Sequence, residues 1–392
     1  EVRAIAWPKG AGEPRVLAGE VQDDLISKDA LPVGEHSIVL YTNANQTYQS
    51  QTIYIAASGS DDNDGTRDKP VRTFAKALET VSHAGRIEII EPGSYIFGTP
   101  SKHRVPKNNK RWITIEPSAG IDRDTIIIGQ ISGTPRPYVE YVRWRNVSFD
   151  CAAFGTYYEG IPWFDNCRFF DSTGWTNSNG PHPARGAYYV TNCLAENKLF
   201  AFSNGVTLLR GSTATRISGD VIQNAKLVIN CTFTDIDGTV LPHHTDIYQI
   251  FSRSDNVILY GIDVTNMTSV QAFMMESYIG RDVPNISGDF DPNYTIRNIA
   301  FVNVHINATP VTKNGDANFG GPPYSHLMGY FEHVIFENVR LPNQRILVRK
   351  QFEMGGCKNV VFRDSLLHWA TYQDLSNDKN GISMINCHSA AR

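Results

Sequence analysis

The 392-residue chain is predicted to fold as an all-β solenoid, in which short strands stack coil upon coil. Three observations predict this fold. A phrase of alternating apolar residues, followed by Asn or a substitute and a second short apolar segment, recurs nine times. Apolar residues make up 41% of the chain and charged residues 19%, which allows a sizeable core and excludes a charge-rich disordered chain. A short amphipathic segment precedes the repeats, where a solenoid needs its open end covered.

Each repeat alternates with period two, as strands do, and then turns at one corner residue. The corner positions are Asn146, Asn166, Asn192, Asn230, Gly261, Asn303, Asn338, Asp364 and Asn386, separated by 20, 26, 38, 31, 42, 35, 26 and 22 residues. Short separations fit one coil, and longer ones fit coils with loop insertions. Asn tolerates left-handed backbone and can hydrogen-bond along the stack, so we interpret these residues as a structural ladder. About nine to eleven coils are expected.

The residue after each corner is small or apolar, as an inward-facing column requires. Four of the six cysteines occupy this column: Cys167, Cys193, Cys231 and Cys387. A free thiol packs as a small hydrophobe. These four cysteines are therefore expected to be buried and reduced rather than paired in disulfides.

A helix is predicted near residues 73–82, because Phe74, Ala77, Leu78 and Val81 form one apolar stripe. The Asp-rich loop before it does not match a calcium loop. With the loop glycine aligned on Gly65, the last ligand position would be a valine. We interpret this loop as a turn that ties the first coil to the helix. No cofactor is required by any motif, and calcium is the one metal left open.

The opening of the repeat region resembles a known group of proteins. The phrase Asp-Asn-Asp-Gly-Thr at residues 62–66, followed by Pro-x-x-Thr-Phe-x-x-Ala-Leu at residues 70–78, resembles the start of extracellular right-handed parallel β-helix proteins. Pectate- and alginate-type lyases, glycoside hydrolases and phage tailspikes belong to that group. The resemblance implies a single-stranded, right-handed parallel β-helix over residues 51–392 with an N-terminal capping helix, and a secreted location. It does not fix the reaction, because one fold hosts many functions.

Residues 1–50 do not fit the repeat. The segment 31–41 alternates and resembles the closing strands of an Ig-like sandwich, but fifty residues are too few for a complete one. We expect a short β-rich appendage or Ig-like remnant at the N-terminal end of the solenoid.

Charge and hydropathy limit the partners. The chain has 36 Lys and Arg against 40 Asp and Glu, a formal charge of −4, which argues against a strongly basic nucleic-acid surface. There is no run of 18 apolar residues, so no membrane span is expected. The chain starts at Glu1, as a mature chain would after loss of an export signal. The expected partner is an acidic polysaccharide, and neither a nucleic acid nor a membrane is expected as a partner. The protein itself is expected to be a monomer or a trimer.

A β-helix has a filled interior, so a ligand must lie in a groove on the outer face of a sheet. The longest coil separations point to residues 205–350. The densest polar phrase there is residues 242–249, where His244, Asp246 and Tyr248 alternate onto one face of a strand. The catalytic candidates are His244, Asp246, Glu276 and Arg349. The substrate-binding candidates are Arg210, His243, Tyr248, Gln249, Tyr278, Arg281, His326 and Lys350. A hydrogen-bonded coil corner explains the His-Asp phrase equally well.

Two reactions and one binding function remain open. A uronate lyase needs a base, a cation for the carboxylate and a proton donor, which His244, Arg349 or Lys350, and Tyr248 or Tyr278 could supply. A glycoside hydrolase needs two carboxyl groups, for which Asp246 and Glu276 are the pair. A tailspike or adhesin would bind glycans without turnover. Elimination is favoured, because histidines and basic residues outnumber acid pairs in the expected groove.

Overall fold

The computed structural model describes residues 51–82, 85–96, 113–129, 142–150, 162–170, 188–198, 201–202, 206–238, 245–250, 255–269, 271–276, 295–310, 324–328, 330–349, 357–377 and 381–391, and the backbone of short strands elsewhere. Parallel strands dominate, and the predicted parallel β-helix is confirmed. The chain divides into two compact units. The first unit is residues 45–221, and the second is residues 1–44 with 222–392.

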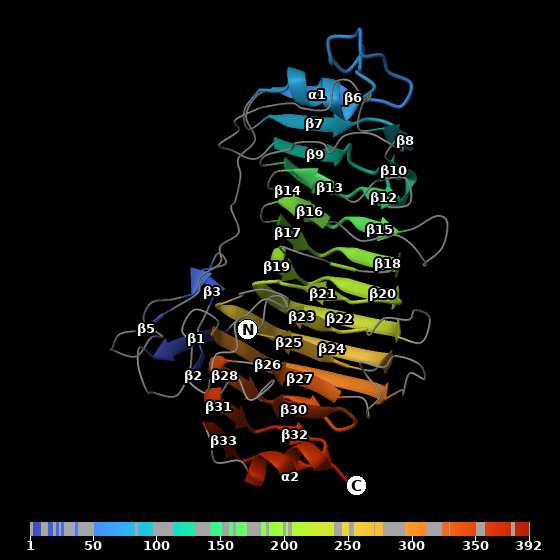
Figure 1. Cartoon of the computed structure of the whole chain (residues 1–392). Coiled ribbons are helices and arrows are strands. Elements are labelled where there is room, and N and C mark those ends of the chain that lie inside the picture. The colour runs from blue at the N-terminus through green and yellow to red at the C-terminus, as the bar shows by residue number, and fades with distance from the viewer. Residues whose placement is uncertain are drawn as a thin grey trace, which may run out of the picture. The chain divides into compact units, whose positions relative to one another are not determined.

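The first unit contains two parallel sheets that follow one another around each coil (Figure 1). Sheet A consists of β6 (Thr52–Ile55), β7 (Arg86–Ile89), β9 (Ile113–Pro117), β11 (Val142–Arg145), β14 (Pro162–Asp165), β17 (Tyr188–Thr191) and β19 (Val206–Arg210). Sheet B consists of β8 (Gly93–Ile96), β10 (Ile126–Gly129), β12 (Ser148–Asp150), β15 (Arg168–Phe170), β18 (Leu194–Lys198) and β20 (Thr213–Ile217). The 3₁₀ turn η2 (Arg123–Thr125) precedes β10, and β13 (Tyr157–Glu159) pairs with β16 (His182–Arg185).

The predicted helix is confirmed as α1 (Phe74–Thr80). Its apolar stripe is buried, and the ring of Phe74 lies 4.9 Å from that of Trp144, edge to face. The hydroxyl of Thr73 caps the helix by accepting from the backbone of Lys76, as N-cap residues do. Both carboxylate oxygens of Asp61 accept hydrogen bonds from Thr73. The Asp-rich loop is therefore a turn that ties the first coil to the helix, as expected.

The second unit contains three parallel sheets. Sheet C consists of β21 (Ile222–Gln223), β23 (Tyr248–Ile250), β25 (Phe273–Glu276), β27 (Tyr324–Met328) and β30 (Arg345–Arg349). Sheet D consists of β22 (Leu227–Asp237), β24 (Val257–Ser269), β26 (Ile296–Pro310), β28 (Phe331–Glu337), β31 (Cys357–Arg363) and β33 (Ile382–Ile385). Sheet E lies after the corner and consists of the second halves of β22, β24 and β26 with β29 (Arg340–Leu341), β32 (Leu366–Leu367) and β34 (His388–Ser389). The helix α2 (Trp369–Asn377) follows β32.

Short antiparallel strands form in residues 1–44. They are β1 (Arg3–Pro8), β2 (Arg15–Ala18), β3 (Val21–Gln22), β4 (Leu25–Ile26) and β5 (His36–Ser37), with β1 paired to β2 and β5, and β3 paired to β4. These strands make the segment β-rich, and its expected place at the N-terminal end of the solenoid stays a prediction. Its origin as an Ig-like remnant stays a prediction.

All nine predicted corner residues have left-handed backbone, with φ between +49° and +65°. Their side chains form the expected ladder. The amide of Asn166 donates to Asn146 at 2.7 Å, and that of Asn338 donates to Asn303 at 2.8 Å. In the last coil Asn386 donates to the carboxylate of Asp364 at 2.6 Å. Each coil therefore turns on one residue that tolerates positive φ.

One coil was not predicted from the sequence. Gly211, at φ +58°, is the corner between Asn192 and Asn230, so the separation of 38 residues contains two coils rather than one long coil. A Cβ at Gly211 would come within 2.7 Å of the Asn192 amide oxygen, which explains the glycine. Coils before Asn146 also lack the phrase. Each coil contributes one strand to sheet A or to sheet D. The described chain has seven strands in sheet A and six in sheet D, so it has more coils than the nine to eleven expected.

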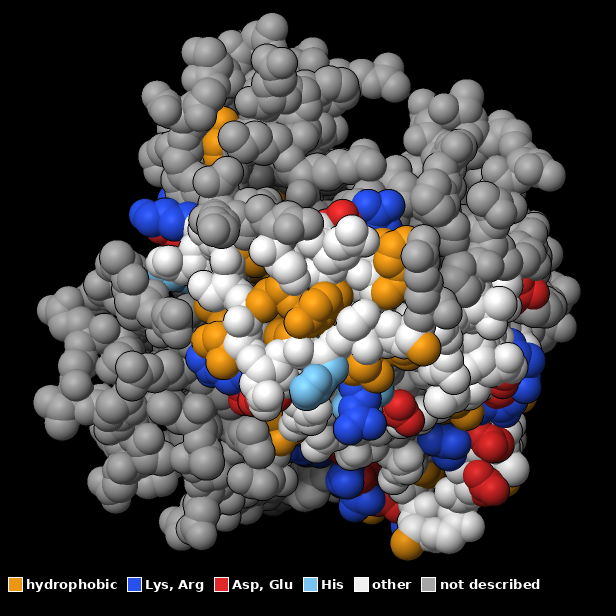
Figure 2. All heavy atoms as spheres, turned by 90° about the horizontal axis from the view of Figure 1, so that it is seen from below, with side chains coloured by type: hydrophobic (Ala, Val, Ile, Leu, Met, Phe, Trp, Pro, Cys, Tyr) orange, Lys and Arg blue, Asp and Glu red, His pale blue; other side chains and the backbone are white. Residues whose placement is uncertain are grey.

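Three of the four column cysteines are buried and reduced, as predicted: Cys167, Cys193 and Cys231. Burial raises the pKa of the Cys193 thiol well above its usual value, so this thiol stays protonated. Cys387 is free but only half-buried, which corrects the expectation for that residue. It lies in the last coil, where Ile385 is 38% exposed. Figure 2 views the molecule from below and shows hydrophobic side chains gathered near the middle of that face.

A residue other than Asn, Asp or Gly should lower the stability of the protein when it is placed in the left-handed backbone of a corner. Replacing Asn338 by Ala should destabilise the protein by about 1–2 kcal/mol more than replacing it by Gly. Both variants lose the amide contact to Asn303, and only Ala adds the steric penalty at φ +49°. Denaturant unfolding of the two variants measures the difference. Equal stability would contradict the backbone explanation.

His333 occupies a corner in a second left-handed column and should make stability depend on pH. It is buried at φ +57°, and its Nδ1 lies 3.3 Å from the amide nitrogen of Asn359. Burial lowers the pKa of His333, with Lys358 and Arg297 acting in the same direction and Glu332 opposing them. The unfolded chain therefore takes up this proton first as the pH falls.

The contribution of His333 to stability is complete above about pH 6.5, the unfolded value, and is lost as the pH falls toward the lower folded value. The variant His333→Asn, which places the usual corner residue there, should lose less stability between about pH 7 and pH 5 than the parent. Thermal unfolding across this range tests the prediction. A variant with the same pH dependence as the parent would refute it.

Candidate functional site

Five of the predicted site residues lie on sheet C of the second unit, whose strands stack in register as expected: Tyr248, Gln249, Glu276, His326 and Arg349. One row of equivalent positions is Gln249, Met274, His326 and Leu347. Two positions further along the strands lies the row of Glu276, Met328 and Arg349. Positions 276 and 349 are thus two rungs apart, or roughly 10 Å at the usual strand spacing. The register brings a carboxylate position and a guanidinium position into one row.

Many of the candidate side chains lie outside the described residues. His243, His244, Tyr278, Arg281 and Lys350 belong to segments that the structure does not describe. For Glu276, His326 and Arg349 only the backbone is described. Arg210 lies in β19 of the first unit, at the position equivalent to Thr191. The roles expected for these residues stay predictions.

Three candidates are corrected by their burial. Tyr248 is fully buried, and its hydroxyl donates to the carbonyl of Ala225 at 2.8 Å, so it cannot donate a proton to a substrate. Gln249 is also fully buried, and its amide nitrogen contacts the Met274 sulfur at 3.0 Å. Asp246 is fully buried as well, which excludes it as a carboxylate facing substrate. Alternation predicted which residues share a face, and it carried no information about what covers that face.

An open row of titratable side chains lies instead on sheet E. Asp263, His305 and Arg340 occupy equivalent positions on three neighbouring strands. Asp263 and Arg340 are exposed and His305 is half-buried. Adjacent rungs are about 4.8 Å apart, so the imidazole lies between a carboxylate and a guanidinium. The repeat pattern did not predict this row, because 42 and 35 residues separate its coils.

The electrostatics of this row favour a neutral imidazole. Burial lowers the pKa of His305, the charge of Arg340 lowers it further, and Asp263 opposes both. The Nε2 atom of His305 is buried and has no hydrogen-bond partner in the described chain. A neutral imidazole can accept a proton, and because Nε2 is enclosed, the half-buried ring would accept it at Nδ1.

Charged residues also line sheet A of the first unit, but there they bind one another. Arg145 bridges Glu116 at 3.0 Å and Asp165 at 3.2 Å. Arg86 contacts Glu116 at 2.9 Å, and Arg143 contacts Asp165 at 2.5 Å. Sheet A therefore carries a continuous ladder of ion pairs across its rungs.

The carboxylates of this ladder are nearly buried and paired with arginines. Asp165 and Glu116 are each only 8% exposed. Burial opposes the charge of Asp165, but hydrogen bonds from Thr191 and Arg143 and the charges of Arg143 and Arg145 outweigh it, so its pKa is lowered. Asp165 is thus a fixed anion rather than a general acid. We interpret the ladder as structural.

No group of three or more metal-ligating side chains occurs among the described residues, and no described helix is long and apolar enough to cross a membrane. No family model matches the chain. A segment of 62 residues is 39% identical to the uncharacterized protein YwoF of Bacillus subtilis (strain 168), over 16% of this chain and 13% of that protein.

Three solved structures illustrate the likeness. A GH136 lacto-N-biosidase from Eubacterium ramulus is 9% identical, with a TM-score of 0.39 over 87% of this chain and 68% of that one. A rhamnogalacturonan lyase is 13% identical, with a TM-score of 0.39 over 88% and 87%. The pectate lyase Pel9A is 11% identical, with a TM-score of 0.38 over 88% and 80%. Likenesses this distant fix neither an activity nor a substrate. By its own strand topology the chain is a parallel β-helix protein.

The ion-pair ladder generates a stability prediction. Replacing Arg145 by Met should destabilise the protein by about 1–3 kcal/mol, because two nearly buried carboxylates each lose a charged partner. Arg67 is the matched control, since it is exposed and lies 3.7 Å from Glu88. Its replacement by Met should cost at most about 1 kcal/mol. Denaturant unfolding compares the two, and equal costs would contradict a structural role for the ladder.

Proposed function

We propose that the protein is a secreted carbohydrate-active enzyme that cleaves an acidic polysaccharide by β-elimination. The observation that carries the proposal is the row on sheet E, where the neutral imidazole of His305 lies between Asp263 and Arg340 on an accessible face. The secreted location is supported only by the resemblance in residues 62–78.

The row supplies two of the groups that elimination needs. Arg340 can pair with the uronate carboxylate, which makes the neighbouring C5 proton more acidic. The Nδ1 atom of His305 can take that proton as the C4–O bond breaks and the C4=C5 double bond forms. The imidazolium can then return the proton to the departing glycosidic oxygen, so one residue serves as base and acid. Asp263 would stabilise the imidazolium between the two steps.

Hydrolysis finds less support. It needs two carboxyl groups that face the scissile bond. Asp246 of the expected pair is fully buried. Asp263 has Thr232 and His305 as its register neighbours, so no second carboxyl stands beside it in that row of the described chain. Glycan binding without turnover is the alternative that the experiments below distinguish from catalysis.

His305→Ala should reduce turnover of uronate polysaccharides by roughly 10²-fold or more. The pH profile gives the sharper test. Arg340 lowers the pKa of His305, so Arg340→Gln should move the acid limb of the rate to higher pH. Asp263→Asn should move it to lower pH, because Asp263 raises that pKa. Ultraviolet absorbance of the unsaturated product, measured beside reducing ends, follows the reaction.

The controls separate this row from the face predicted on sheet C. His244→Ala and Arg349→Ala should leave turnover largely unchanged if the sheet E row carries the chemistry. The reverse pattern would move the active site to sheet C and refute the sheet E assignment. New reducing ends without ultraviolet absorbance would identify a hydrolase, and neither signal would identify a binding protein.

A further inference from the structure

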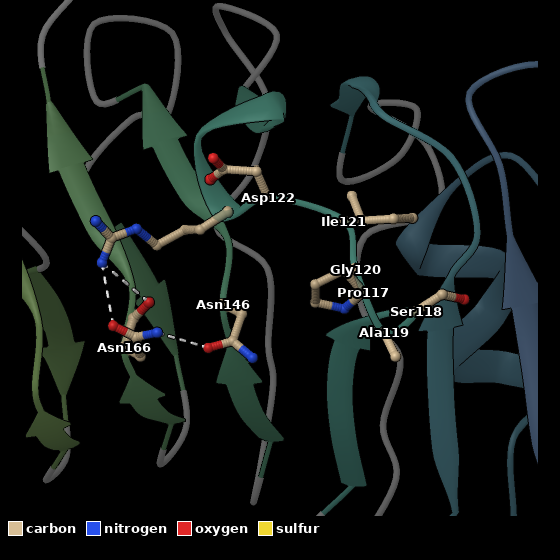
Figure 3. Close-up of a pocket in the computed structure, with 9 residues that line it drawn as sticks. Pro117, Ser118, Ala119, Gly120, Ile121, Asp122, Asn146 and Asn166 are labelled. Atoms are coloured by element: carbon tan, nitrogen blue, oxygen red, sulfur yellow. Dashed lines mark hydrogen bonds between the residues drawn. The ribbon is translucent and has the colours of Figure 1, made fainter.

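A polar hollow of about 400 Å³ lies at the corner of the first unit (Figure 3). It is lined by Pro117, Ser118, Ala119, Gly120, Ile121, Asp122, Arg123, Asn146 and Asn166. This volume falls within the range of small-molecule pockets, roughly 300–1,000 Å³. The hollow exists because residues 118–125 form a loop between β9 and β10, where the next coil turns on Asn146 and Val147 alone.

The loop interrupts the asparagine ladder and leaves it with an open end. The amide oxygen of Asn146 accepts from Asn166 at 2.7 Å, so the ladder continues on that side. On the other side the preceding coil has no corner asparagine, and the amide nitrogen of Asn146 has no hydrogen-bond partner within the described chain. Asn146 therefore presents an unused N–H donor at the wall of the hollow (Figure 3).

The other lining groups are fixed and their charges balance. Arg123 donates to the side-chain oxygen of Asn166 at 3.2 Å, which holds its guanidinium against the ladder. Asp122 accepts from the backbone of Asp124 at 2.9 Å and is exposed, so its second carboxylate oxygen can accept a further hydrogen bond. Ile121, Pro117 and Ala119 add a small apolar surface. Because Arg123 is already paired with Asp124 at 3.3 Å, the groups left for a ligand are a carboxylate oxygen and an amide donor, which suit an uncharged ligand that both donates and accepts.

We propose that this hollow binds a neutral hexopyranose unit through neighbouring hydroxyl groups. One hydroxyl accepts from the Asn146 amide and extends the ladder, while it or its neighbour donates to Asp122. The C–H face of the ring lies against the small apolar surface. This site does not depend on the proposed elimination, because it uses no residue of the sheet E row and requires no turnover.

The test uses the full chain with methyl β-galactopyranoside and methyl β-glucopyranoside as probes. Saturation-transfer NMR and the side-chain amide signals of asparagine should report binding with a Kd of about 1–10 mM. Asn146→Asp removes the donor and keeps an acceptor for Asn166. Asp364 shows that a carboxylate is tolerated at such a corner, with φ +49°. This variant should bind at least about tenfold more weakly, because it replaces a donor by a repelling acceptor.

Asn303→Asp is the matched control, because Asn303 also ends a ladder segment but does not line the hollow. It should bind the probes as the parent does. Asp122→Asn is the second variant, and it keeps an oxygen for Asp124 while weakening the sugar contact. Absence of binding by the parent, or equal binding by Asn146→Asp and the parent, would overturn the proposal. Preferential binding of galacturonate over both neutral probes would overturn the neutral class of ligand.

Discussion

Left-handed residues at the coil corners are the constraint on which the structure depends. A corner must reverse direction within one or two residues, and Asn, Asp and Gly predominate there at φ near +50°, with His333 and Arg216 as exceptions. Because corner side chains stack along the axis, each amide can bind the next one and hold adjacent coils in register. The strands on both sides of the corner inherit that register.

A shared register makes the outer faces of the sheets into rows of equivalent positions. In the first unit the rows of sheet A hold alternating charges that neutralise one another, with Arg145 between two carboxylates. In the second unit the row on sheet E is short and exposed, and His305 stays neutral beside Arg340. The same stacking therefore yields a structural ladder in one place and a chemically available cluster in another. The two rows differ in the number of oppositely charged partners that each side chain has.

Interruptions of the stack are as informative as its continuity. The loop of residues 118–125 replaces a tight corner and opens a hollow against Asn146. Gly211 keeps the corner but removes the side chain, so Asn192 lacks an amide neighbour in the next coil. Such positions leave hydrogen-bonding groups of the ladder unused, and a ligand can reach them only where a hollow lies beside them.

The sequence by itself determined the fold class, the corner residues, the capping helix and the inward column that holds Cys167, Cys193 and Cys231. These are local properties, because a residue that tolerates positive φ and a period-two apolar pattern are visible without knowing any neighbour. The tertiary structure alone decided which polar residues meet. The coils differ in length, so Asp263, His305 and Arg340 become neighbours only through strand pairing. Burial was decided in the same way. Tyr248 and Asp246 look accessible in an alternating segment, yet the packing around them leaves both fully enclosed.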